Sequence, residues 1–175
     1  MCKVQRLDQF HVCFDLSKFA QYEIDKWLEF AFARQVQRLE LDLSIGGEEP
    51  RDYDDCYTFP EHLLDLTDNV YQSHLNKFPP PWYNFKSVKV LLFKSVNVTG
   101  EVLEFFLHNC PFLEEMVVRG SGTLVNFEVV GPSLKLKHLE IWYCFDLKSL
   151  QIYDTNFVTL RTQQETNYCF VMFQC

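Results

Sequence analysis

The chain has 175 residues, of which 47% are hydrophobic and 23% charged, so it can bury the core of one globular domain, or of part of one, and is not expected to be disordered. Its formal net charge of −8 at pH 7 repels phosphate backbones and anionic membrane surfaces. These properties argue against nucleic acid and membranes as partners.

The start of the chain and its cysteines bear on the compartment. Residues 1–6 lead into no apolar signal segment, and no stretch approaches the roughly 18 apolar residues of a membrane span. Seven cysteines are scattered without a CxxC pair, which is typical of reduced thiols. The sequence therefore predicts a protein of the cytoplasm or the nucleus.

The first predicted elements are two strands with a helix between them. Residues 7–12 and 36–41 carry apolar side chains in one shared pattern, in which they face a common interior. Residues 22–34 place apolar side chains at the spacing i, i+3, i+4, i+7, which predicts an amphipathic helix. The expected apolar face consists of Ile24, Trp27, Leu28 and Ala31.

An acidic loop is predicted over residues 46–55, because its Gly, Pro and like charges favour exposed backbone. Such a loop could bind a cation or a basic partner. Its Asp spacing lacks the Gly and the final Glu of a calcium-binding EF-hand loop. A loop that is only solvated is therefore the simpler interpretation.

Residues 88–93 repeat the strand pattern, and a second helix is expected after them. Thr99 is its expected N-cap, Glu101 lies in the first turn, where the helix dipole favours negative charge, and Pro111 ends it. Its expected buried face consists of Val102, Leu103, Phe106 and Leu107.

Four more copies of the strand pattern follow, at residues 113–118, 124–129, 136–141 and 147–152. Their middle apolar positions are 11 or 12 residues apart, too close for a strand, a helix and two turns. Glycine-rich turn signals separate the strands. We therefore expect these last rungs of the ladder to run from strand to turn to strand without helices.

Together these segments form an internal repeat. The clearest copy, Leu136-x-x-Leu139-x-Ile141-x-x-Cys144, matches the LxxLxLxx(N/C) frame of a leucine-rich repeat. One step is longer than the others, 52 residues between the middle positions of 36–41 and 88–93. Because 52 is twice 26, it predicts a hidden repeat among residues 59–71, for which residues 62–66 are the best candidate.

The repeat predicts an α/β fold, a leucine-rich-repeat solenoid with short parallel strands on the concave face and helices or turns on the convex face. We expect this domain to cover residues 1–155 with about seven to eight irregular repeats. For the tail, residues 156–175, two possibilities stay open: an irregular segment, or one extra strand over residues 168–173.

The repeat frame also predicts a binding face, because side chains alternate along a strand and those between the inward positions point to the concave surface. That surface would comprise Gln9, His11, Cys13, Arg38, Glu40, Asp42, Val90, Leu92, Lys94, Glu115, Val117, Arg119, Asn126, Glu128, Val130, His138, Glu140, Trp142, Ser149, Gln151 and Tyr153. The predicted partner-binding residues are Arg38, Asp42, Leu92, Lys94, Val117, Arg119, Glu140, Trp142 and Tyr153.

Within this face, interfaces concentrate their energy on Trp, Tyr and Arg. Trp142, Tyr153 and Arg119 are thus the expected hot spots, with Leu92 and Val117 as an apolar floor. For Trp142, a role in merely covering a rung explains its position equally well.

Several strings resemble the leucine-rich-repeat region of plant F-box/LRR-repeat proteins. They cover about residues 5–155 and include residues 10–16, 25–30, 36–43, 94–100, 109–115 and 134–141. In that family an F-box helix bundle docks on the Skp1-type adaptor of a cullin-RING ubiquitin ligase, and the repeats recruit the substrate. The resemblance implies that this chain is the substrate-binding half of such a subunit.

The chain departs from the family pattern at both ends. It has no F-box before residue 5, and residues 159–175 do not resemble the FBD domain that often closes such proteins. We therefore expect a fragment, a truncated product or a decoy, for which a Skp1-type adaptor is a partner only if a longer product contains an F-box.

No catalytic or metal-binding motif stands out. The five histidines lack the HExxH spacing, and the chain contains no GxSxG, P-loop or GxGxxG string. His11 and Cys13 share a strand face and Cys144 lies near His138, so a chance zinc or thiol site stays an alternative. A packed repeat cysteine explains Cys144 better. We expect no enzyme activity, no cofactor and no metal.

Three functions are compatible with the sequence. The first is a protein-interaction module resembling the substrate-recognition region of an F-box subunit of an SCF-type E3 ubiquitin ligase. The second is a stand-alone leucine-rich-repeat scaffold without a ligase role. The third, an enzyme built on the same repeats, is the least supported. The first two share a protein bound to the concave face.

Overall fold

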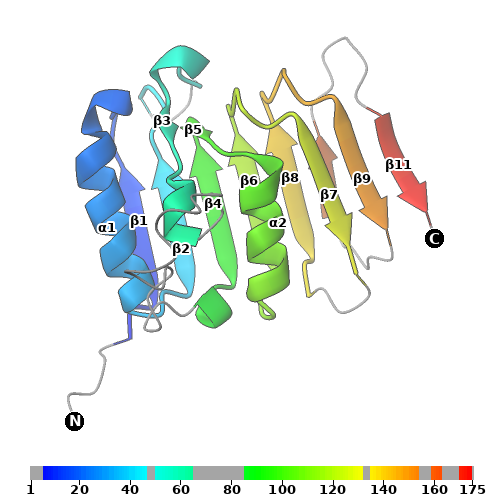
Figure 1. The fold of residues 1–175 in the computed structure, drawn as a ribbon, viewed down its shortest axis with the longest axis horizontal. Helices are drawn as coiled ribbons and strands as arrows, with labels where there is room; N and C mark the ends of the chain where they lie inside the picture. The colour runs from blue at the N-terminus through cyan, green and yellow to red at the C-terminus, as the bar shows by residue number, and fades with distance from the viewer. Residues whose placement is uncertain are drawn as a thin grey trace, which may run out of the picture.

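Six short parallel strands form the main sheet of the protein in the computed structural model, which describes residues 6–46, 50–64, 85–131, 135–153, 159–162 and 170–174. In spatial order they are β1 (Gln9–Cys13), β2 (Arg38–Asp42), β4 (Val90–Lys94), β6 (Glu115–Arg119), β8 (His138–Trp142) and β10 (Thr159–Thr162). Figure 1 shows them side by side, and every neighbouring pair is parallel. The ladder of parallel strands that the repeat predicts is confirmed.

Inward-facing residues of successive strands are aligned rung upon rung. The first row is Phe10, Leu39, Leu91, Met116, Leu139 and Leu160, and the second row is Val12, Leu41, Phe93, Val118 and Ile141. Most of these side chains are fully buried in one core. A slip of one residue would turn a strand's whole apolar set toward water, so burial fixes the register.

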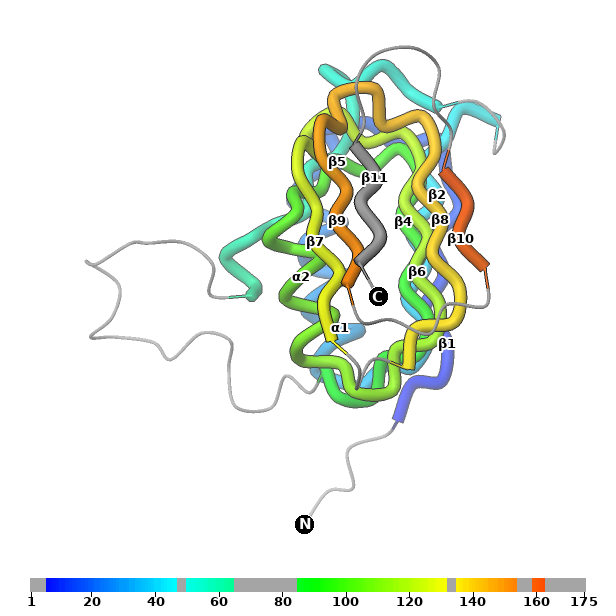
Figure 2. Tube along the Cα trace, turned by 90° about the vertical axis from the view of Figure 1, so that its right-hand side faces the viewer, coloured from blue at the N-terminus to red at the C-terminus, as the bar shows by residue number. Residues whose placement is uncertain are grey.

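A second layer faces the main sheet across this core. It contains α1 (Gln21–Ala33), α2 (Gly100–Asn109) and a second parallel sheet of β7 (Asn126–Val130), β9 (Ser149–Tyr153) and β11 (Phe170–Gln174). Figure 2, seen along the stack of rungs, shows the two layers on opposite sides of the core. Inward residues of β7 and β9 belong to the same core as those of the main sheet.

The strand patterns at residues 124–129 and 147–152 lie in this second layer, so the expectation that they are further rungs of the main ladder is wrong. Each step of 11 or 12 residues is half a turn of the solenoid, and a full turn takes the 23 residues from Met116 to Leu139. The expected loss of helices is confirmed, because β7 and β9 occupy the layer that α1 and α2 occupy earlier in the chain.

Two strands lie beyond residue 155, where the sequence suggested that the repeats end. β10 extends the main sheet beside β8, and β11 extends the second sheet beside β9. The repeating structure therefore continues into the C-terminal tail.

Helix α1 forms where the sequence predicts it, but its buried face differs. Ile24, Leu28 and Ala31 are fully buried, whereas Trp27 is 38% exposed and Phe32 is buried in its place. Phe32 packs in the core against Phe85 and Phe106, with ring centroids 4.9 and 6.3 Å away. Segment β3 (Tyr57–Thr58) contacts the start of the helix. There the Tyr57 hydroxyl donates to Asp25 Oδ1 at 2.7 Å and Gln21 Nε2 donates to the Thr58 carbonyl at 2.9 Å.

Helix α2 buries the predicted residues, which are Val102, Leu103, Phe106 and Leu107. Thr99 is the N-cap residue, as predicted, but its side chain makes no capping hydrogen bond. Its hydroxyl lies 3.1 Å from Glu61 Oε1 and donates to that carboxylate instead. None of the helices among the described residues is long and apolar enough to cross a membrane.

The hidden repeat among residues 59–71 is not a rung of the main sheet, because β2 pairs directly with β4. Residues Glu61–Leu64 form a 3-10 turn, η3, and residues 65–71 of that stretch lie outside the described residues. Just before it, β3 pairs with β5 (Val96–Asn97) in a short separate sheet. The part of the chain that the structure describes has three further 3-10 turns, η1 (Lys18–Ala20), η2 (Tyr53–Asp55) and η4 (Phe85–Ser87).

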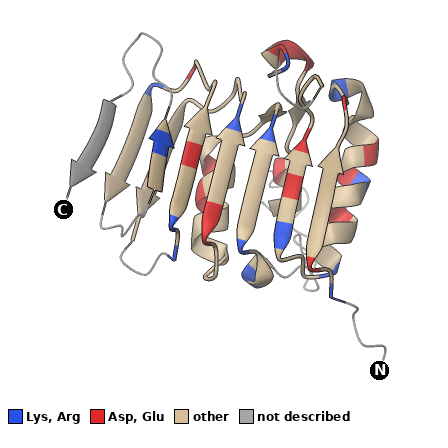
Figure 3. Ribbon diagram, turned by 180° about the vertical axis from the view of Figure 1, so that it is seen from behind, with Lys and Arg blue, Asp and Glu red and all other residues tan. Residues whose placement is uncertain are grey.

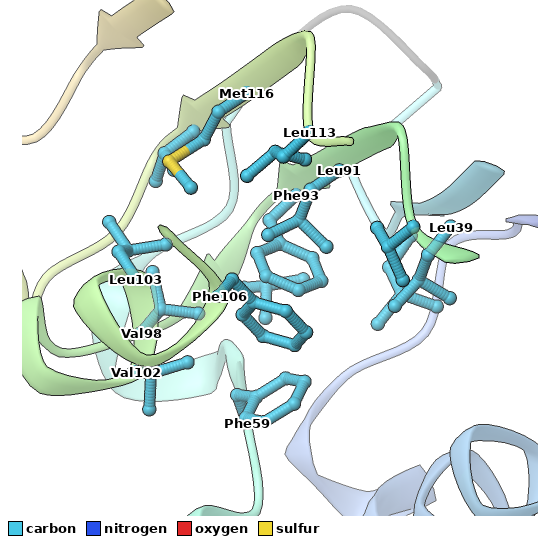
Figure 4. Close-up of a cluster of buried hydrophobic side chains, with 14 of the residues drawn as sticks. Leu39, Phe59, Leu91, Phe93, Val98, Val102, Leu103, Phe106, Leu113 and Met116 are labelled. Atoms are coloured by element: carbon cyan, nitrogen blue, oxygen red, sulfur yellow. The ribbon is translucent and has the colours of Figure 1, made fainter. Parts of the chain in front are cut away.

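Aromatic side chains fill the core between the two layers (Figure 4). The rings of Phe59, Phe93 and Phe106 lie 5.5 to 6.5 Å apart, and all three side chains are buried. Burial of such a side chain contributes about 1.5–3 kcal/mol, and each edge-to-face pair adds roughly 0.5–1.5 kcal/mol. This packing holds α2 and the segment before η3 against β4.

Candidate functional site

The candidate site is the outer face of the main sheet, defined as the side that points away from the core. Because strand side chains alternate, the register places its residues in three rows across the strands. They are Gln9, Arg38, Val90, Glu115, His138 and Thr159; then His11, Glu40, Leu92, Val117, Glu140 and Arg161; then Cys13, Asp42, Lys94, Arg119 and Trp142. Figure 3 shows acidic and basic residues interspersed along these strands.

The centre of the outer face is apolar but largely covered. Leu92 and Val117, adjacent in the middle row, are only 8% and 4% exposed. They therefore form the floor that the sequence predicts, but little of that floor is open to a partner. Longer charged side chains stand around it and form the accessible part of the face.

On one side of this floor, Lys94 pairs with Asp42. Lys94 Nζ lies 2.5 Å from Asp42 Oδ2, and the Asp42 side chain also accepts from the Ser44 backbone N–H at 3.3 Å. Desolvation opposes ionisation of Asp42, but the hydrogen bonds from Lys94 and Ser44 outweigh it and lower the pKa of Asp42 below its ordinary value. The predicted residues Asp42 and Lys94 thus satisfy each other.

On the other side, Arg119 pairs with the buried carboxylate of Glu140. Arg119 Nε donates to Glu140 Oε1 at 2.5 Å, and Arg119 Nη2 forms an ion pair with the same oxygen. His138 Nε2 lies 3.6 Å from Glu140 Oε2. A buried carboxylate is stable only when it is paired, so Arg119 holds Glu140 in place as well as offering a partly exposed guanidinium.

The edge near β1 and β2 carries a third charged group. Arg38 Nε lies 3.2 Å from Glu40 Oε2, and Arg38 Nη1 lies 3.9 Å from Glu115 Oε2. His11 Nε2 is 3.6 Å from Glu40 Oε1. Charges on the outer face are therefore largely neutralised by neighbours, so this surface offers many polar contacts without a strong net field.

Trp142 stands at the end of the third row, half-buried beside Arg119. Its indole N–H is buried and has no hydrogen-bond acceptor in the described part of the chain. Burial of part of the indole ring stabilises the fold, and the unpaired N–H offsets about 1–3 kcal/mol of that.

Tyr153 and five other predicted face residues are elsewhere. Asn126, Glu128, Val130, Ser149, Gln151 and Tyr153 lie on β7 and β9, on the outer side of the second sheet. The Tyr153 hydroxyl donates to Gln151 Oε1 at 2.7 Å there. The structure therefore brings Trp142 and Arg119 together on the outer face and separates Tyr153 from them, because the short steps alternate between the two layers.

Two parts of the surface were missed from the sequence. Arg161 continues the middle row on β10 opposite Glu140, and is exposed. The repeat frame does not predict its strand, because Phe157 and Leu160 match the first two apolar positions but the third is the polar Thr162.

The second missed part is the described stretch of the acidic loop, residues 50–55. It was expected to be exposed, but Arg51 forms ion pairs with Asp15 and Asp55, and its backbone N–H donates to Ser95 Oγ at 2.9 Å. The carbonyl of Tyr53 accepts from Asn97 Nδ2 at 2.9 Å. Residues 50–55 are thus a strap fastened over the ends of the strands, which the Arg and Tyr within an otherwise acidic segment could have indicated.

Catalytic and metal chemistry has little support in the described residues. No group of three or more His, Cys, Asp or Glu is placed there to hold a metal ion. Burial raises the pKa of the Cys56 and Cys144 thiols to about 11 and also raises that of Cys110. Thiols of this kind are poor nucleophiles near neutral pH, so they contribute to packing.

Comparison with known proteins gives a family. The family model described as At1g61320/AtMIF1, LRR domain, matches residues 2–174. A protein named as an FBD-associated F-box protein, At5g56560 of Arabidopsis thaliana, is 28% identical over 185 residues that cover 97% of this chain and 40% of that protein. One named as an F-box/LRR-repeat protein, At5g02700 of Arabidopsis thaliana, is 26% identical over 122 residues that cover 64% of this chain and 24% of that protein.

The chain thus spans well under half the length of either relative. No solved structure matches it.

Proposed function

We propose, from the premise that this chain belongs to the leucine-rich-repeat domain family of the At1g61320/AtMIF1 type, that the outer face of its main sheet binds another protein. Leucine-rich repeats of this kind are protein-interaction regions. The finer role that we propose is substrate recognition within an F-box subunit of an SCF-type ubiquitin ligase, which would act in the cytoplasm or the nucleus.

One observation carries the choice of surface. The parallel register sets Arg119 and Trp142 next to each other on adjacent strands, where both stay partly accessible above the buried floor of Leu92 and Val117. Arg and Trp are the side chains that interfaces use most for binding energy. The second sheet, where Tyr153 lies, has no such pair among its described outward residues.

The ligase role is supported by the relatives' names, both of which include the F-box. This chain covers only part of each relative. A longer product that contains an F-box would bind the adaptor, and the repeats would bind the substrate. The alternative is a leucine-rich-repeat scaffold without a ligase role, and binding to the adaptor distinguishes the two.

The surface is tested by quantitative capture from plant extract with the wild-type chain and matched variants. Trp142→Ala should abolish capture of a defined set of proteins, whereas Tyr153→Ala on the second sheet and Lys26→Ala on α1 should leave it unchanged. Equal losses in all three variants, with folding intact, would refute the outer face as the binding surface.

Arg119 needs a compensated variant, because Arg119→Ala would leave the buried Glu140 carboxylate unpaired and cost roughly 3–5 kcal/mol of stability. The double variant Arg119→Gln/Glu140→Gln removes both charges at once. It should fold and should lose capture of the same proteins as Trp142→Ala.

The ligase role is tested with the full gene product and a purified Skp1-type adaptor. The substrate-receptor role is supported if the longer product binds the adaptor and its capture of substrate still depends on Trp142. Capture that depends on Trp142 in a full product that does not bind the adaptor would establish the scaffold instead.

A further inference from the structure

Four aromatic residues form a continuous patch at the end of the strands, which we call the aromatic ledge: Tyr53, Trp142, Tyr143 and Phe145. Ring centroids lie 6.0 Å apart for Trp142 and Tyr143, and 6.2 Å apart for Tyr143 and Phe145 and for Tyr53 and Phe145. Phe145 is 58% exposed, and the other three are half-buried. The ledge begins on the outer face, at Trp142, and extends over its rim.

The ledge is held rigidly rather than left as a loose turn. The Tyr53 hydroxyl donates to the Tyr143 carbonyl at 2.5 Å and accepts from the Phe145 backbone N–H at 3.4 Å. A Cβ added at Gly122 would lie 2.5 Å from Tyr53 Cβ, so only glycine lets the strap sit this close.

Tyr143 also adopts a left-handed backbone conformation, with φ of 54°. A residue other than glycine pays about 1–2 kcal/mol for this. Ser95 and Gly120, which follow β4 and β6 at the equivalent position, have φ of 52° and 69°, so Tyr143 adopts the turn with which the rungs leave the main sheet.

The surroundings of the ledge are acidic. Asp146 follows Phe145 and is exposed, and Asp52 and Asp54 are exposed on the strap on either side of Tyr53. Of the nearby cations, Arg51 is engaged by Asp15 and Asp55, and Arg119 by Glu140. The exposed cations nearby are Lys148, close in sequence, and Lys18, whose Nζ donates to the Asp54 carbonyl at 2.9 Å. Exposed carboxylates therefore adjoin two of the four rings, Phe145 through Asp146 and Tyr53 through Asp52 and Asp54.

Aromatic faces and carboxylates together recognise one kind of side chain. A guanidinium stacks on aromatic rings and accepts neighbouring carboxylates as ion-pair partners, and it loses less hydration on doing so than an ammonium group. We propose that the aromatic ledge is the docking site for an arginine side chain in a basic segment of the bound protein. This inference deepens the proposed function, on which it rests, by giving the partner its chemistry.

The test is NMR titration of the ¹⁵N-labelled chain with a short blocked peptide that contains two arginines, compared with the same peptide carrying citrulline. Citrulline keeps the planar shape of the arginine side chain but has no charge, and a carbonyl acceptor replaces one of its NH2 donor groups. The arginine peptide should shift the Trp142 indole signal and the backbone signals of Tyr143 and Phe145, and the citrulline peptide should not.

Variants sharpen the test. Phe145→Ala and Asp146→Asn should each lower the affinity for the arginine peptide by about two- to fivefold, as expected for loss of one exposed cation–π or ion-pair contact. Phe112→Ala is the control, because Phe112 is similarly exposed, at 48%, and lies away from the ledge under Lys135. Phe145 is exposed, so its removal should leave the melting temperature unchanged.

Equal shifts with citrulline, shifts spread over other acidic residues, or unchanged binding in Phe145→Ala would each overturn the arginine site. Those results would leave the capture experiment on Trp142 untouched, so failure of the ledge and failure of the protein-binding face are separable.

Discussion

Lys94 and Asp42 lie opposite each other on adjacent parallel strands, with Nζ and Oδ2 2.5 Å apart on the outer face of the main sheet. Asp42 is almost fully buried, and its counter-ion comes from a residue 52 positions later in the chain. The pair therefore links the pairing of β2 with β4 to pH.

The pKa of Asp42 is lower in the folded protein than in the unfolded chain, so folding favours the ionised form. The stability it contributes is present above about pH 4 and is lost as pH falls through the lowered folded-state pKa. Lys94→Met should cost roughly 3–5 kcal/mol near pH 7, because it leaves the buried Asp42 carboxylate without its counter-ion. Urea denaturation from about pH 7 to pH 3 should show the wild type and the variant converging toward low pH. A constant difference across that range would contradict the assignment.

Leu139→Ala tests the inward register. Leu139 is fully buried between Met116 and Leu160 of the neighbouring strands, so its truncation should lower the free energy of unfolding by about 2–5 kcal/mol. Chemical denaturation measures this directly. Lys26→Ala, on the exposed side of α1, should change it by less than about 0.5 kcal/mol.

Gly100→Ala tests the approach of α2 to the second sheet. A Cβ at residue 100 would overlap the carbonyl oxygen of Asn126 in β7. The higher helix propensity of alanine, worth about 1 kcal/mol, cannot offset a clash with backbone, so we expect net destabilisation measured as a lower melting temperature. Gly46→Ala is the comparison, because that site has φ of 61° but no atom within 4 Å, and only backbone strain of about 1–2 kcal/mol should follow.

Thiol modification tests the burial of the cysteines. Cys13 is exposed on the edge strand β1, whereas Cys56, Cys110 and Cys144 have raised pKa values from burial. Iodoacetamide at about pH 8 should therefore alkylate Cys13 first among these four, and the other three only after urea is added. Peptide mass spectrometry resolves the order. Early modification of Cys144 would mean that the turn after β8 opens in solution.

Much of the fold was predictable because the repeat frame reports burial directly. Leu39, Leu91, Met116 and Leu139 fall in one row, as the frame indicates, and α1 and α2 form over the expected segments. Of the predicted concave residues, those on β1, β2, β4, β6 and β8 point away from the core as expected, because a strand with one buried side must turn its alternate residues outward.

What the sequence by itself determined is thus which side chains face inward, since that depends only on alternation within each strand. What only the tertiary structure decided is which layer each strand joins. An apolar alternation is identical for a strand of the main sheet and for one of the second sheet, so Tyr153 and Trp142 looked equivalent. Their separation depends on turns such as the one at Tyr143, and the clamp by Tyr53 depends on a contact 90 residues away along the chain, which no local pattern encodes.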